Sequence, residues 1–391
     1  MNSYKKFNTY GKLKNVMLGT YFYPEFFSTI ADSKVRVPLQ RIAHEINEDL
    51  EKFQSVLKDF GCSVLRSEQV VDKFDVHNVY RPPLEVRNTH GVVGDTMYQF
   101  NFDHHHPIDS ILKSYCSDIK NLANENYKFF QNSTTVASAE SYNSSTNLWY
   151  SRKKYTELAG SDWPAFDDLV TGNFNCKPDI REEIDSFMDV LVYETKEFLP
   201  LQSPNILNLD DKIYIDAVEY CDYSSWFKLY NNDLRPIEQF TSGAGHVDGC
   251  FIILNSDTII GIDPLIDYKQ YFPNHYVIGV DPDSYQNKIK EFNIMKSKVG
   301  GKWWVAGEEH NSIFINFVET HLKGWLGHVH ETIFDVNALV LDEHTVCVSN
   351  ITDSVAAEFK KRKIEYIVVP WRHRFFVDGG LHCITLDLYR E

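Results

Sequence analysis

The stretch Val377-Asp378-Gly379-Gly380-Leu381-His382-Cys383-Ile384-Thr385-Leu386-Asp387-Leu388-Tyr389-Arg390-Glu391 ends the chain. A Gly-Gly pair lets a backbone turn tightly and come close to a ligand. The alternating run after Cys383 is typical of a half-buried β-strand. The stretch therefore predicts a thiol at the mouth of a terminal strand. The alternative is that Cys383 is simply a small buried hydrophobic residue of that strand.

A second stretch could supply a partner for this thiol. His246-Val247-Asp248 lies between glycines and directly before the apolar run Phe251 to Leu254. In extended backbone, residues i and i+2 point to the same side, so His246 and Asp248 are predicted to face one cleft. A His-x-Asp pair alone is a weak signal, because it occurs often by chance.

The two stretches together resemble the guanidino-group modifying enzymes. Among these, the amidinotransferases typified by glycine amidinotransferase carry a His-x-Asp motif and a late Gly-rich His-Cys motif in the same order. The resemblance extends from the N-terminal strand to Cys383, so we expect a single domain over residues 1–391. It implies a pentein fold, an α/β propeller of five strand-and-helix modules around a central active site. The residues themselves show no repeat.

Hydrophobic periodicity agrees with an α/β chain. Residues 11–20 and 62–66 are predicted as strands, and residues 37–60, with apolar positions spaced by three or four, as an amphipathic helix that ends at Gly61. Hairpins are predicted over residues 203–215, 251–262 and 334–348. A helix over 354–361 and a strand over 366–369 precede the terminal stretch.

Three further site residues are assigned through the resemblance alone. The family shows Arg-Asp, whose Asp holds a guanidinium, where this chain has Arg87-Asn88. Asn205 lies at the position of an acid that pairs with the catalytic His in the related enzymes. Asp335 precedes the phrase Asn-x-Leu-x-Leu-Asp-Glu, next to which the family builds part of its substrate pocket.

The implied chemistry is covalent catalysis on a guanidinium carbon. Cys383 would attack the amidino carbon, His246 would act as acid and base, and Asp248 would hold the guanidinium nitrogens. An amidinotransferase passes the amidino group from arginine, or a related donor, to an amine such as glycine. Two alternatives stay open: a guanidine or ureido hydrolase on the same scaffold, in which water takes the place of the amine, and a catalytically silent pentein that binds a ligand or a partner protein.

Asn88 and Asn205 replace two carboxylates by neutral amides, which weakens the hold on a cation because charge-assisted hydrogen bonds are stronger than neutral ones. Three explanations are open. The donor is less basic than arginine, or activity is low or lost, or nearby acids take over the role. The candidate acids are Asp210, Asp211, Asp216 and Asp335.

Composition excludes several other function classes. A formal net charge of −16 disfavours a nucleic-acid surface. The seven Cys include no Cys-x-x-Cys pair, and the imidazoles of Asp103-His104-His105-His106 are adjacent and so point in different directions; we therefore expect neither a metal nor a cofactor. No stretch approaches eighteen apolar residues and the N-terminus lacks a signal-like segment, so we expect a cytoplasmic protein. A homodimer is implied by the resemblance only.

Overall fold

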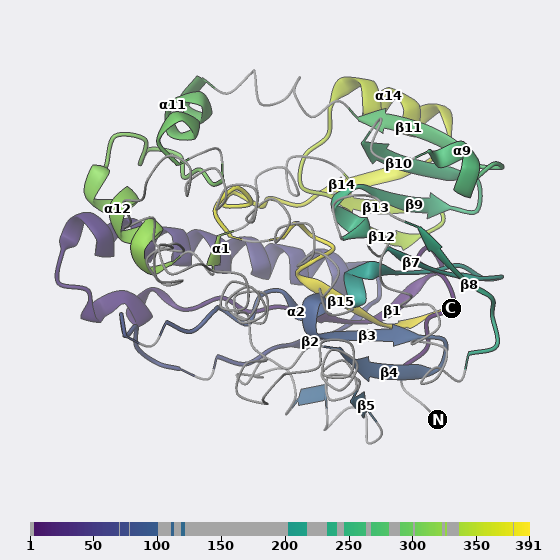
Figure 1. The fold of residues 1–391 in the computed structure, drawn as a ribbon, viewed down its shortest axis with the longest axis horizontal. Helices are drawn as coiled ribbons and strands as arrows, with labels where there is room; N and C mark the ends of the chain where they lie inside the picture. The colour runs from purple at the N-terminus through teal and green to yellow at the C-terminus, as the bar shows by residue number, and fades with distance from the viewer. Residues whose placement is uncertain are drawn as a thin grey trace, which may run out of the picture.

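The computed structural model describes residues 4–69, 71–77, 79–100, 111–112, 119–121, 202–216, 233–240, 246–262, 267–280, 290–299, 302–322, 325–326, 336–377 and 379–391 (Figure 1). Within these residues the strands form five three-stranded sheets. Helices lie between and around the sheets, so the predicted α/β class is confirmed.

All five sheets follow one pattern. A central strand pairs antiparallel with one neighbour and parallel with the other. The sheets are β15 (Thr385–Arg390), β1 (Leu13–Leu18) and β2 (Ser63–Arg66); β3 (His90–Val93), β4 (Thr96–Gln99) and β5 (Lys120–Asn121); β6 (Ile206–Asn208), β7 (Ile213–Asp216) and β8 (Ile237–Phe240); β9 (Phe251–Asn255), β10 (Thr258–Ile262) and β11 (Tyr276–Val280); and β12 (Leu339–Asp342), β13 (Thr345–Val348) and β14 (Glu365–Val368).

In three of these sheets a described helix lies in the connection between the two parallel strands, because a parallel pair needs a crossover connection. Helix α1 follows β1, α9 follows β10, and α14 follows β13, each before its parallel partner strand. The described helices are η1 (Pro24–Thr29), α1 (Ser33–Asp59), α2 (Val86–Thr89), η3 (Ser203–Asn205), η4 (Val247–Gly249), α9 (Tyr268–Tyr271), α11 (Lys290–Val299), α12 (Ser312–His321) and α14 (Asp353–Lys361).

Helix α1 is the longest described helix and buries the predicted apolar face. It begins one turn before the predicted start at Val37, because the Asp32 side chain accepts a hydrogen bond from the backbone N–H of Lys34 at 2.8 Å and caps the first turn. It ends before Gly61, whose φ of +96° is the left-handed conformation common after a helix. Hairpins are also present within the predicted stretches 203–215, 251–262 and 334–348, over residues 206–215, 251–262 and 339–348.

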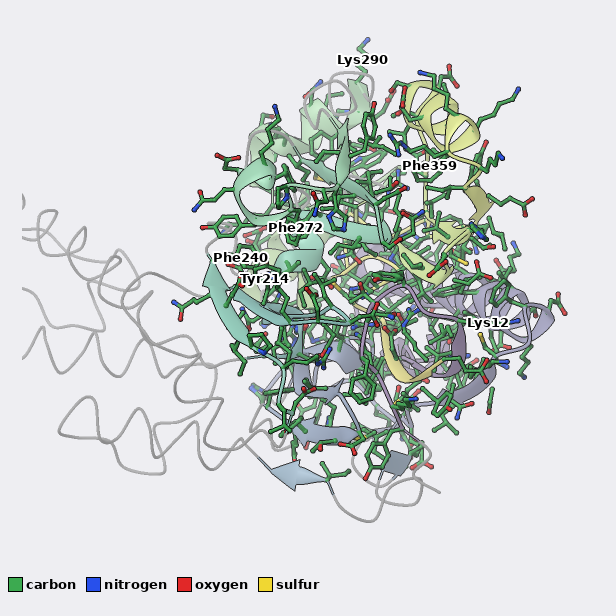
Figure 2. All side chains as sticks on the ribbon, turned by 90° about the vertical axis from the view of Figure 1, so that its right-hand side faces the viewer. Lys12, Tyr214, Phe240, Phe272, Lys290 and Phe359 are labelled. Carbon is green, nitrogen blue, oxygen red and sulfur yellow. The ribbon has the colours of Figure 1, made fainter. Side chains whose placement is uncertain are left out.

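Aromatic side chains join neighbouring sheets. The ring of Tyr214 on β7 lies 5.8 Å from that of Phe240 on β8 and 5.2 Å from that of Phe272, which directly follows α9 (Figure 2). Phe272 in turn meets Phe251 on β9 at 5.4 Å. Such edge-to-face pairs add to the energy of area burial. The cluster therefore connects the β6–β7–β8 sheet to the β9–β10–β11 sheet.

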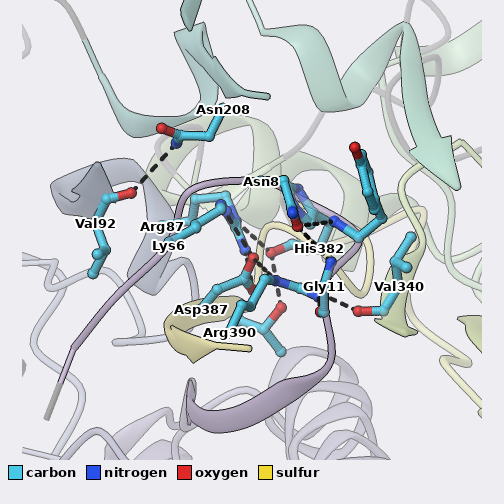
Figure 3. Close-up of polar contacts among 12 residues, drawn as sticks. Lys6, Asn8, Gly11, Arg87, Val92, Asn208, Val340, His382, Asp387 and Arg390 are labelled. Atoms are coloured by element: carbon cyan, nitrogen blue, oxygen red, sulfur yellow. Dashed lines mark hydrogen bonds and ion pairs between the residues drawn. The ribbon is translucent and has the colours of Figure 1, made fainter. Parts of the chain in front are cut away.

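Strand β15 differs from the half-buried strand that its alternation predicts. Thr385 and Asp387 on the supposedly exposed face are fully buried. The Asp387 carboxylate is compensated by Arg87 at 2.9 Å, Lys6 at 3.1 Å and Arg390 at 3.0 Å (Figure 3). A buried carboxylate is tolerated when it is paired and hydrogen-bonded. The strand can therefore be buried on both faces.

The charges around Asp387 shift one another's protonation. Burial alone would raise the pKa of Asp387, but Arg390, Lys6 and Arg87 hold that pKa well below its usual range. Burial lowers the pKa of Lys6 to about 8, against the attraction of Asp387, and the charges of Arg87 and Arg390 lower it further. At neutral pH the cluster holds one carboxylate among three cations.

A second buried carboxylate positions the segment that precedes the terminal turn. Asp49 of α1 is fully buried and accepts hydrogen bonds from the backbone N–H of Arg372 at 2.9 Å and from its Nε at 3.0 Å. Trp371 then donates from Nε1 to the carbonyl of Gly379 at 3.1 Å. These contacts tie the glycine pair to the long helix.

No helix within the described ranges is both long enough and apolar enough to cross a bilayer.

Replacing Asp387 by Asn should destabilise the fold by about 3–5 kcal/mol, because it leaves three buried cations without their counter-charge. Denaturant unfolding of both proteins measures the loss, with the exposed Asp211→Asn as a control that should stay within about 0.5 kcal/mol of the parent.

The same comparison across pH tests the electrostatic origin. Since the pKa of Asp387 is depressed in the fold, its contribution is present above the ordinary aspartate pKa of about 4 and is lost as pH falls through the folded value. The difference between parent and Asp387→Asn should therefore narrow in acid. An equal difference at every pH would contradict this account.

Candidate active site

Cys383 lies in the turn Leu381–Ile384 directly before β15, and its side chain is buried. Both glycines before it make room. A Cβ on Gly379 would lie 2.6 Å from the Cβ of Cys383, and a Cβ on Gly380 would lie 2.7 Å from Oδ1 of Asn337. Gly379 also has a φ of +91°, which favours glycine. The Gly-Gly pair is thus needed for the close packing around the thiol.

Asn337, two residues before β12, is the side chain that holds this turn. It is 3% exposed, and its Nδ2 donates to the Cys383 sulfur at 3.0 Å and to the carbonyl of Asp248 at 3.2 Å. Its Oδ1 accepts from the backbone N–H of His382 at 3.0 Å and of Cys383 at 3.2 Å. One buried amide therefore joins the terminal turn to the His-x-Asp stretch.

Asp248 stands between Cys383 and His382. Its Oδ2 lies 2.7 Å from Nδ1 of His382 and accepts from the Cys383 sulfur at 3.4 Å. Burial alone would raise the pKa of Asp248, but the hydrogen bond and charge of His382, with His246 and Arg87, lower it to about 2. Burial and the charge of Arg87 lower the pKa of His382 to about 4, outweighing Asp248. At neutral pH, an ionised Asp248 therefore accepts a hydrogen bond from a neutral His382.

His246 takes up a different geometry from the one that its spacing predicts. The backbone at residues 247–249 is the short helix η4 rather than an extended strand, so the two-residue spacing does not by itself set which way the side chains point. The imidazole Nε2 lies 2.9 Å from Oε1 of Gln202, and within the described residues Nδ1 has no hydrogen bond. In the tautomer in which Nε2 donates to Gln202, Nδ1 carries the lone pair and is the nitrogen that can exchange a proton.

Asn205 forms hydrogen bonds that hold Gln202, the partner of His246. Its Oδ1 accepts from the backbone N–H of Gln202 at 2.7 Å, and its Nδ2 donates to the carbonyl of Asp216 at 3.2 Å. The partner that the structure places on the His246 ring is thus the side chain of Gln202. Asn205 holds Gln202 in place.

Asn88 lies on α2, which contacts both η3 and β15. Its Nδ2 donates to Glu85, whose side chain is 14% exposed. The position that a Cβ on Gly379 would take is 3.6 Å from Cγ of Glu85 and 2.6 Å from Cβ of Cys383, so Glu85 packs against the glycine turn that carries Cys383. The Glu85 carboxylate also lies 3.4 Å from Arg81. A carboxylate therefore stands next to the neutral Asn88.

Two buried acceptor atoms in this region lack a donor. Oδ1 of Asp248 and Oδ1 of Asn88 are enclosed and have no hydrogen-bond partner within the described part of the chain. Leaving a buried acceptor unpaired costs about 1–3 kcal/mol, and more for a charged group. Both atoms can accept from the N–H groups of a bound ligand.

The sequence missed four residues of this arrangement, namely Gln202, Glu85, Asn337 and His382. His382 and Asn337 belong to the motifs quoted above, where only Cys383 and Asp335 were singled out. Asp335 and the stretch Asp103 to His106 lie outside the described residues. Of the other acids proposed to replace a lost charge, Asp210 is engaged by Asn8 and Tyr10. Within the described ranges, no group of three His, Cys, Asp or Glu side chains could hold a metal ion.

No protein-family model matches the sequence, and no curated protein matches it significantly. Solved structures with a similar fold do exist. SxtG, an amidinotransferase of Microseira wollei from the saxitoxin biosynthetic pathway, aligns with 12% identity and a TM-score of 0.57 over 100% of this chain and 98% of its own. Inosamine-phosphate amidinotransferase StrB1 from Streptomyces griseus gives 12% and 0.57 over 100% and 97%.

A hydrolytic enzyme shares the fold as well. ArgZ, an arginine dihydrolase from the ornithine-ammonia cycle in cyanobacteria, aligns with 8% identity and a TM-score of 0.50 over 96% of this chain and 41% of its own. These likenesses show that the chain has the α/β fold of the pentein enzymes.

Gly379→Ala should disturb the thiol more than a glycine substitution of equal backbone strain elsewhere. The matched control is Gly61→Ala, where φ is also positive but nothing lies within 4 Å of the added Cβ. The left-handed conformation costs each variant about 1–2 kcal/mol, and the overlap with Cys383 should cost Gly379→Ala a further ~1–3 kcal/mol. Denaturant unfolding compares the two. Equal losses would contradict the proposed close packing.

Proposed function

We propose that the chain is an amidinotransferase. It would move an amidino group from arginine, or a related guanidino donor, to an amine acceptor such as glycine through a covalent amidino-Cys383 intermediate. The observation that carries the proposal is the buried sulfur of Cys383 beside the carboxylate of Asp248. The second oxygen of this carboxylate, Oδ1, is buried and has no hydrogen-bond donor within the described residues. A guanidinium supplies N–H donors and a carbon for the thiolate to attack.

The proposed steps use Cys383, Asp248 and His246. The proton of the Cys383 thiol passes to Nδ1 of His246, and the resulting thiolate bonds to the amidino carbon while Asp248 accepts hydrogen bonds from the guanidinium nitrogens. His246 gives a proton to the departing nitrogen as the carbon–nitrogen bond breaks, which leaves the amidino group on sulfur. His246 then takes a proton from the acceptor amine, the amine nitrogen bonds to the carbon, and the thiolate leaves.

Hydrolysis is the second candidate function, because the fold is shared with an arginine dihydrolase. Water would replace the amine in the last step, and Cys383, His246 and Asp248 would keep their roles.

The proposal extends to the architecture. The five sheets of one pattern support a propeller of five modules formed by one domain over residues 1–391. The pairing of the C-terminal β15 with the N-terminal β1 would close the ring, and it also brings the two chain ends together.

Incubation with arginine should place one amidino group on Cys383, detected by intact-protein and peptide mass spectrometry. Glycine or another amine should discharge it. Cys383→Ser should give no adduct, and Cys347→Ser should behave as the parent, because burial raises the pKa of the Cys347 thiol to about 12. Discharge in water alone would favour the hydrolase. Absence of any adduct from arginine and from other guanidines would overturn the proposed function.

Glu85 is proposed to supply the negative charge that Asn88 lacks. Titration calorimetry with arginine, in Cys383→Ser protein that cannot turn over, tests this. Glu85→Gln should weaken binding about tenfold or more, because a hydrogen bond to a charged group contributes ~1.5–3 kcal/mol. Asn88→Asp should not strengthen binding, since it sets a second carboxylate against Glu85.

The double variant Glu85→Gln with Asn88→Asp returns the charge to the family position and should recover part of the affinity. Glu365→Gln on the exposed side of β14 is the matched control and should bind as the parent. Unchanged affinity in Glu85→Gln would exclude Glu85 from the cation site.

A further inference from the structure

Asn337 uses every hydrogen-bonding position of its side chain. A carboxamide has two N–H groups and an oxygen with two lone pairs. Nδ2 donates to the Cys383 sulfur and the Asp248 carbonyl, and Oδ1 accepts from the N–H groups of His382 and Cys383. The flipped amide would place oxygen against two acceptors and nitrogen against two donors. The network therefore admits one orientation, with N–H directed at the sulfur.

The Nδ2–H of Asn337 offsets a nearby negative charge that disfavours the Cys383 thiolate. The Asp248 carboxylate lies 3.4 Å from the same sulfur. A neighbouring negative charge opposes formation of a thiolate, whereas a hydrogen bond donated to the thiolate favours it. Asn337 can give this help without adding a charge that would repel a cationic donor. A lysine or arginine at the same place would carry a positive charge and would repel the cationic donor.

We propose that Asn337 is the positioning residue that prepares Cys383 for attack. Its N–H stabilises the thiolate next to the Asp248 carboxylate, and its oxygen fixes the backbone of the turn so that the sulfur stays in one place. This inference rests on the proposed function only in taking Cys383 as the nucleophile.

Asn337→Asp is the direct test. The aspartate keeps the size of the side chain and an oxygen for the two backbone N–H groups, but it replaces the donor to sulfur by a negatively charged acceptor. The uncharged Gly380→Ala variant below separates the loss of the donor from this added charge. Alkylation of Cys383 by iodoacetamide, followed by peptide mass spectrometry from neutral to alkaline pH, measures the thiolate. The rate near pH 7 should fall about tenfold or more and meet the parent rate at high pH, so the midpoint of the profile moves up by about one unit or more.

The matched control is Asn208→Asp. Asn208 is also buried, and it is also bonded through both ends of its amide, to the Val92 carbonyl (Figure 3) and to Arg235. Within the described residues it has no hydrogen bond to Cys383 or Asp248. Its alkylation profile should match that of the parent. A residue with a merely structural role would change stability without moving the midpoint.

Gly380→Ala provides a second route to the same answer. The added Cβ would lie 2.7–2.8 Å from the Asn337 side chain and must push the amide away from the sulfur. Gly380→Ala should also raise the midpoint of the Cys383 alkylation profile. It is the deciding variant if circular dichroism shows that Asn337→Asp is unfolded. An unshifted midpoint in a folded variant overturns the proposal, even where amidino transfer is observed. A shifted midpoint supports it even where arginine leaves no adduct.

Discussion

The buried carboxylate of Asp387 is the constraint on which the site depends. It is paired with three cations from three places in the chain: Lys6 near the N-terminus, Arg87 on α2 and Arg390 within its own strand. Arg87 also donates to the carbonyl of His382 at 3.0 Å, directly before Cys383. Leaving any of these charges unpaired in the interior would be costly, so the segments come together as a unit.

The charge cluster around Asp387 also connects two sheets, the one that contains β1 and the one that contains β12. Arg390 donates to the carbonyls of Gly11 and Val340, which belong to the segments leading into β1 and forming β12 (Figure 3). The terminal strand is therefore held by charge and by its ladder with β1 at once. A turn carried by such a strand has little freedom, which suits a nucleophile that must stay aligned.

The site combines few charges with many directed hydrogen bonds. Three neutral amides supply the directed hydrogen bonds, namely Asn337, Gln202 and Asn205. Each places a donor or an acceptor at a position where a charged side chain would change the net charge of the site. The ionised group at the thiol is Asp248. Under the proposed function, this division would let a buried site receive a cation and still hold a reactive sulfur. Electrostatic complementarity comes from the acids, and geometry comes from the amides.

The sequence by itself determined the local features, namely the α/β alternation, the amphipathic α1, the hairpins and the Gly-Gly turn at Cys383, and through motif order it predicted that this turn meets Asp248. These follow from periodicity, turn residues and a recognisable pattern, all of which are short-range. Only the tertiary structure decided that β15 is buried on both faces, that Gln202 meets His246, and that Asn337 donates to the thiol. Each of these contacts joins residues far apart in the chain, and burial or charge compensation across such distances leaves no periodic trace in the sequence.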